Sequence, residues 1–128
     1  MYQTVSIRSL HLEYQLWVRE LTFYKEEIKI FENHLEDLVS RNTRQDVQMQ
    51  IEHFQNQFIC QKEVIDILKH KLNISERQLA AFVYDLSGGI IENARMDNHS
   101  DLREEVITFR RLYKVLKTDF RHFEAEWM

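Results

Sequence analysis

The chain of 128 residues contains no proline, one cysteine and only two glycines, which are adjacent at Gly88 and Gly89. The lone cysteine, Cys60, excludes an intramolecular disulfide, and we expect a cytoplasmic protein. A phosphate-binding loop needs a preceding strand, further glycines and usually a Lys-Ser/Thr pair, none of which this sequence provides. The glycine pair therefore indicates either a helix end or, as the favoured interpretation, the close approach of a neighbouring helix.

Further absences narrow the class of protein. No stretch approaches the roughly 20 apolar residues that a membrane span requires, and the first residues lack the charged-then-apolar pattern of a secretory signal. The net charge of −4 argues against a surface built throughout for nucleic acid. With 44% apolar and 30% charged residues, the chain is neither disordered nor membrane-embedded by composition. Its length suits a single domain over residues 1–128.

Apolar residues recur in alternating steps of four and three along most of the chain. This heptad spacing predicts long helices that pack through continuous seams. The first seam comprises Leu10, Tyr14, Trp17, Leu21, Tyr24, Ile28, Phe31, Leu35 and Leu38. The second comprises Val47, Ile51, Phe54, Phe58, Gln61, Ile65, Leu68 and Leu72. The last comprises Leu102, Val106, Phe109, Tyr113, Leu116, Phe120, Phe123 and Trp127, and a shorter segment before it carries Leu79, Val83, Leu86, Ile90 and Ile91.

Polar stretches between the seams predict the helix ends. Thr43 can cap the second helix, and Ser75 with Gln78 forms a capping box for the third. The stretch DNHSD is expected to end the third helix and to open the fourth at Asp101. We therefore predict helices over 8–40, 44–73, 76–96 and 101–127. Because the connections are short, we expect an all-α, antiparallel up-down-up-down four-helix bundle with coiled-coil-like heptad seams. A three-helix, spectrin-like bundle with the third and fourth segments joined is the alternative.

Six histidines bring a metal-binding bundle into consideration. Di-iron bundles hold their metal with Glu-x-x-His on two helices and a Glu from each of the others, and this chain has no Glu-x-x-His. His11, His70 and His122 would approach one end of the bundle, but from positions that flank the seams. We therefore expect surface histidines, no metal ligand and no cofactor, and we keep a metal-binding four-helix bundle as an alternative function.

No pattern of residues predicts catalysis, and we expect a protein that is not an enzyme. Cys60 lies among apolar residues, which predicts a buried and unreactive thiol. Gln61 is the one polar residue of its seam. We expect it to face Tyr24 and Tyr113, whose hydroxyls would satisfy its amide in a buried polar layer that fixes the register.

Charged residues form two stripes. The basic stripe on the last helix comprises Arg110, Arg111, Lys114, Lys117 and Arg121. The acidic stripe on the first helix comprises Glu13, Glu20 and Glu27, which are seven residues apart. Pairing between helices, or plain solvation, is the favoured interpretation of both stripes. Binding of nucleic acid or of an acidic partner through the basic stripe is the alternative.

The helix lengths predict self-association. The first predicted helix is about 18 Å longer than the third, so the first hairpin should overhang the second near Arg41-Asn42. The apolar residues of this overhang are Leu35, Leu38, Val39, Val47 and Ile51. A second apolar stripe, away from the seam, comprises Leu16, Phe23 and Ile30. Because a monomer would expose several of these side chains, we predict a homodimer with two-fold symmetry through one of the two sets.

The stretches FYKEEIKIFENHLEDLVSRNT, IEHFQNQF and FEAEWM give the chain an overall likeness to a known group. It resembles small helical-bundle proteins of Bacteroidetes-type bacteria that carry no assigned function. The stretches consist of helix-face and turn residues, so the resemblance implies no activity. The sequence thus predicts a non-enzymatic helical-bundle interaction or structural module that self-associates and can have an unidentified protein partner.

Overall fold

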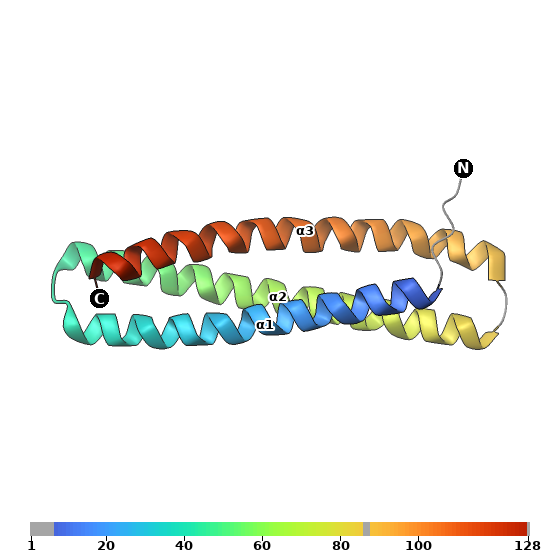
Figure 1. The fold of residues 1–128 in the computed structure, drawn as a ribbon, viewed down its shortest axis with the longest axis horizontal. Helices are drawn as coiled ribbons and strands as arrows, with labels where there is room; N and C mark the ends of the chain where they lie inside the picture. Colours follow the sequence, from blue (N-terminus) through green and yellow to red (C-terminus); the bar gives the residue numbers. More distant parts are fainter. Residues whose placement is uncertain (1–6, 86–87, 128) are drawn as a thin grey trace.

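Three long helices make up the computed structural model, which describes the backbone of residues 7–85 and 88–127 and the side chains of residues 8–81 and 99–127. Helix α1 spans Ile7–Arg41, α2 spans Gln45–Asp85 and α3 spans Gly88–Trp127. The helices lie along a common axis and form an elongated bundle (Figure 1). Each connection reverses the chain, so α1 and α3 run parallel to each other and antiparallel to α2.

The prediction of four helices was wrong, and the three-helix alternative fits. The segment predicted over 76–96 is divided between two helices, because its first part continues α2 and its last part belongs to α3. The three-helix alternative had instead joined all of residues 76–96 to the fourth predicted helix. Both predicted breaks, at 73–76 and at 97–101, lie inside helices.

The physical reason lies in two polar residues that occupy seam positions. Ser75 follows Leu72 by three residues and precedes Leu79 by four, and it is only 5% exposed. His99 precedes Leu102 by three residues and is only 3% exposed. The seams therefore continue through both sites, and the local capping signals are overridden by packing.

The glycine pair stands at the start of α3, which begins at Gly88. The helix-end interpretation therefore fits, and the expectation that the pair lies in the interior of a helix was wrong. Two glycines in a helix interior cost about 2 kcal/mol relative to alanine, and this cost favours a helix boundary at the pair. Side-chain packing around Gly88 and Gly89 falls outside the described residues.

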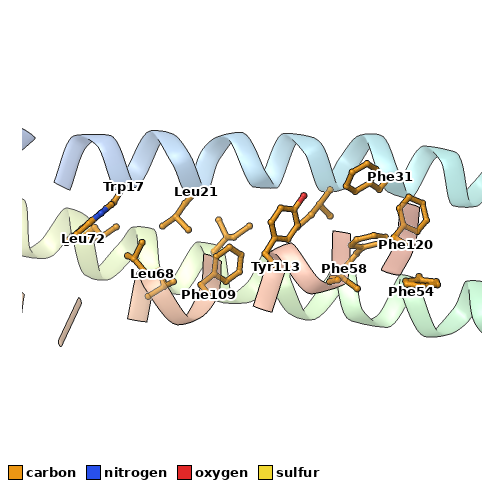
Figure 2. Packing of buried hydrophobic residues seen from close by; sticks show 14 of the residues in the cluster. Trp17, Leu21, Phe31, Phe54, Phe58, Leu68, Leu72, Phe109, Tyr113 and Phe120 are labelled. Atoms are coloured by element: carbon orange, nitrogen blue, oxygen red, sulfur yellow. The ribbon is translucent and has the colours of Figure 1, made fainter. Parts of the chain in front are cut away.

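The three seams together form one continuous core (Figure 2). Aromatic rings dominate the part of the core near the α1–α2 turn. The cluster there comprises Phe31, Phe54, Phe58, Phe120 and Phe123, with ring centroids 5.0–6.4 Å apart in the contacting pairs. Aliphatic residues such as Leu21, Leu68 and Leu72 continue the core toward the other end. Within the described side chains, the bundle is thus held by one continuous core that is mostly apolar and includes the buried Ser75 and His99.

Candidate interaction surfaces

A column of carboxylates on α1 faces a column of cations on α3. The ion pairs are Glu13–Arg103 at 3.0 Å, Glu20–Arg110 at 2.6 Å and Glu27–Lys117 at 2.9 Å. The two residues of every pair are 90 positions apart. The constant separation shows that α1 and α3 are parallel and in register, as expected for residues that flank the seams of parallel helices. An up-down four-helix bundle would instead place its first and last helices antiparallel.

Two of the five residues of the basic stripe take part in these ion pairs. Arg110 and Lys117 face α1 and are paired, as the favoured interpretation of the two charged stripes expects. Arg111, Lys114 and Arg121 are exposed and have no ion-pair partner within the described residues. The stripe therefore divides into an interhelical part, which aligns α1 with α3, and a solvated part.

The predicted overhang does not exist. Its residues Leu35, Leu38, Val47 and Ile51 are almost completely buried in the core. The reason is the length of α3, which extends to Trp127, where the Arg44 guanidinium lies 5.1 Å from the indole ring centroid. Helix α3 thus covers the α1–α2 turn (Figure 1). These four residues cannot form a dimer interface, although Val39 in the same region is exposed.

The second apolar stripe remains in solvent. Leu16, Phe23 and Ile30 are 55%, 55% and 54% exposed, respectively. Their seven-residue spacing places them in one column along α1, on the same side of the seam as the glutamates that face α3. Three large side chains in such a column form an extended apolar surface of the kind that marks an interface.

His99 forms a buried polar cluster that the sequence did not reveal. Its ring stacks on Trp17 with centroids 5.4 Å apart, and it meets the edge of Tyr14 at the same distance. Its Nε2 atom lies 3.1 Å from a Glu13 carboxylate oxygen and 2.9 Å from an Arg103 guanidinium nitrogen. Burial lowers the pKa of His99 below its ordinary value; Glu13 opposes this shift and Arg103 adds to it. The sequence did contain a signal for its burial, because His99 lies three residues before the seam residue Leu102 and so occupies the next seam position.

The buried His99 is expected to make the protein less stable in acid. Because its pKa is lowered in the folded state, the unfolded chain binds more protons once the pH falls below about 6.5. The contribution of neutral His99 to the free energy of unfolding is then lost progressively with further acidification. Urea unfolding at several pH values between neutral and mildly acidic measures this slope, which should be shallower in His99→Gln. The same slope in both proteins would contradict the prediction.

The buried polar layer around Gln61 was predicted with the wrong partners. The Tyr24 hydroxyl donates to Glu20 at 3.2 Å, and the Tyr113 hydroxyl donates to Glu27 at 2.6 Å. Burial and the nearby Glu27 raise the pKa of Tyr113, which keeps its hydroxyl protonated. The buried Oε1 atom of Gln61 accepts no hydrogen bond from the described residues. Gln61 instead lines a groove between α2 and α3.

The candidate nucleophile and metal ligands are dispersed. Cys60 is exposed, so the prediction of a buried thiol was wrong. His11 pairs with Glu76 at 2.6 Å, whereas His70 and His122 lie on other parts of the surface. Across residues 8–81 and 99–127, no three His, Cys, Asp or Glu side chains gather in a way that could hold a metal ion.

Comparisons with known proteins add no relative. The chain matches no family model, no curated protein and no solved structure. The resemblance to helical proteins of Bacteroidetes-type bacteria therefore stays a prediction. Among the described helices, none is both long and apolar enough to cross a membrane.

Proposed function

We propose that this chain is a non-enzymatic helical interaction module that pairs with a second copy of itself through the α1 stripe formed by Leu16, Phe23 and Ile30. The observation that carries the proposal is the exposure of all three side chains, each more than half in solvent. Burying such side chains in an interface contributes roughly 25 cal/mol for each Å² of apolar surface removed from water. Pairing would bury the whole column at once.

The charges beside the stripe favour an antiparallel, two-fold arrangement. A two-fold axis through Phe23 would place Leu16 of one protomer opposite Ile30 of its partner. Arg19 and Glu26 lie on one flank of the stripe, are exposed, and have no ion-pair partner in the described part of the chain. In an antiparallel pair, equivalent flanks meet, so Arg19 of each protomer approaches Glu26 of the other. Two intermolecular ion pairs would then close one side of the interface.

Light scattering coupled to gel filtration at micromolar concentration tests self-association. The full chain is expected to have the mass of a dimer, and Phe23→Glu the mass of a monomer, because the substitution buries an unpaired carboxylate at the two-fold axis. Val115→Glu is the matched control, since Val115 is equally exposed but lies on α3. It should remain dimeric. A monomeric wild-type protein would overturn the proposal.

Charge exchange tests the arrangement separately. Arg19→Glu alone should weaken the dimer by placing like charges together, and the double substitution Arg19→Glu with Glu26→Arg should restore it. If Phe23→Glu dissociates the dimer but neither charge variant changes its stability, the α1 stripe is the interface and the antiparallel arrangement is excluded.

A further inference from the structure

A groove runs along the outer side of the α2–α3 pair. One part has a volume of about 320 Å³, and its apolar lining comprises Val64, Leu68, Phe109 and Leu112. The adjoining part, with a volume of about 510 Å³, is polar and extends to Gln78 and Asp101. Glu105 lines both parts, so the two adjoin at this residue and are together called the groove.

The half of the groove around Glu105 and Asp101 is acidic. Glu104 and Glu105 line the apolar part, whereas Glu105 and Asp101 line the polar part, to which Lys71 contributes one ammonium group. Lys71 is already paired with Glu105 at 2.7 Å. Asp101 and Glu104 are exposed and have no ion-pair partner among residues 8–81 and 99–127. Two carboxylates are therefore left to attract a cationic group.

Further exposed apolar residues lie beside the apolar part of the groove. Ile67 and Val115 lie one turn from Val64 and Leu112, respectively, and each is 56% exposed. Gln61 also lines this part, but its Oε1 atom is buried and accepts no hydrogen bond from the described residues. This end of the groove therefore offers exposed apolar area.

We propose that this groove binds an amphipathic helix of a partner protein, with large apolar side chains along one half and Lys or Arg along the other. The groove from Leu112 to Asp101 is roughly 17 Å long, about three helical turns. Helices that bind in grooves use apolar anchors at i, i+3, i+4 and i+7, which fit the apolar half. The partner's cations would face Asp101 in the polar part and Glu104, which lines the neighbouring apolar part.

The charges distinguish this occupant from two others. A second copy that docked through its α1 stripe would bring Glu20 and Glu26 toward the acidic half of the groove, and like charges would meet. An anionic membrane surface would be repelled for the same reason. The proposal does not depend on the homodimer, since the groove and the α1 stripe lie on different helices.

Fluorescence anisotropy with two labelled synthetic peptides of about 16 residues tests the groove in the full chain. The basic probe carries leucines at the helical anchor spacing in its first half and lysines in its second half. The acidic probe is identical except that glutamates replace the lysines. The basic probe is expected to bind at least about tenfold more tightly than the acidic one, and the difference should shrink with added salt.

Three variants locate the binding. Leu112→Asp should weaken the basic probe by more than about tenfold, since it places a carboxylate in the apolar half. Glu104→Lys should reduce the preference for the basic probe. Leu12→Glu, on α1 and outside both the groove and the α1 stripe, should leave its affinity unchanged, since Leu12 is also 55% exposed. Circular dichroism verifies that each variant is folded, and Val115→Asp replaces Leu112→Asp if the latter is not.

Four outcomes would overturn the proposal. They are equal affinity for the two probes, binding that survives both Leu112→Asp and Val115→Asp, displacement of the basic probe by anionic vesicles, and a dimer that Leu112→Asp dissociates. The last outcome would mean that a second copy covers the groove.

Discussion

Replacing Phe120 by alanine is expected to lower the free energy of unfolding by about 3–5 kcal/mol. Phe120 is fully buried on α3, and its ring lies 5.0–5.5 Å from three others, those of Phe31, Phe54 and Phe58. The substitution removes apolar contacts with both other helices at once and leaves a cavity that the surrounding helices can fill only in part. Figure 2 shows the four rings gathered at one end of the core.

Urea unfolding followed by circular dichroism measures the loss, and the exposed Val115 provides the matched control on the same helix. Val115→Ala should change the free energy of unfolding by no more than about 0.5 kcal/mol. If Phe120→Ala is unfolded without urea, Phe120→Leu should show a smaller loss in the same direction. A loss below about 1 kcal/mol in Phe120→Ala would mean that the aromatic rings are not packed together.

Heptad spacing predicted the core almost completely, because burial follows the period of the helix rather than the number of helices. Among the described side chains, residues 8–81 and 99–127, the seam residues of the sequence are nearly all buried in the structure. The exposed column of Leu16, Phe23 and Ile30 was predicted by the same logic, as residues off the seam. The acidic and basic stripes were also visible in the sequence as seven-residue repeats.

The number of helices could not be predicted in this way. A serine with a glutamine three residues later is a capping box when the chain turns, and an ordinary pair of helical residues when it does not. Only the presence of the other helices around Ser75 makes burial in the seam the better state. His99 was misread for the same reason, because its polar neighbours in DNHSD resembled a loop. Continuing the seam back from Leu102 would have placed it correctly.

The α2–α3 groove could not be predicted from the sequence at all. Its two walls depend on which residues of α2 stand opposite which residues of α3, and the helix boundaries set that register. With a break placed near Ser75, Val64 and Leu112 belong to helices separated by a third. Once α2 is continuous, the Lys71–Glu105 pair fixes an antiparallel register that brings them to the same level.

Glu27→Ala is expected to lower the free energy of unfolding by about 1.5–3 kcal/mol, a large effect for a single charged residue. Glu27 accepts hydrogen bonds from the Tyr113 hydroxyl at 2.6 Å and from the Lys117 ammonium at 2.9 Å. Tyr113 is almost fully buried, and it reaches from α3 toward α1 (Figure 2). Removing the carboxylate would leave the buried hydroxyl without its acceptor, which costs more than losing the partly buried ion pair with Lys117 alone.

A double-mutant cycle with Tyr113→Phe separates the two interactions. In the Tyr113→Phe background no hydroxyl remains to be left unpaired, so Glu27→Ala should cost only about 1 kcal/mol, the upper end of the range for ion pairs near the surface, because the pair with Lys117 is partly buried. Glu20→Ala is the matched control one heptad away, because Glu20 likewise accepts from a cation, Arg110, but the hydroxyl that donates to it belongs to the half-buried Tyr24. Its cost should be smaller than that of Glu27→Ala and unchanged by Tyr113→Phe. If Glu27→Ala costs the same in both backgrounds, the Tyr113 hydroxyl does not depend on Glu27, and the column of ion pairs between α1 and α3 acts only through surface charge.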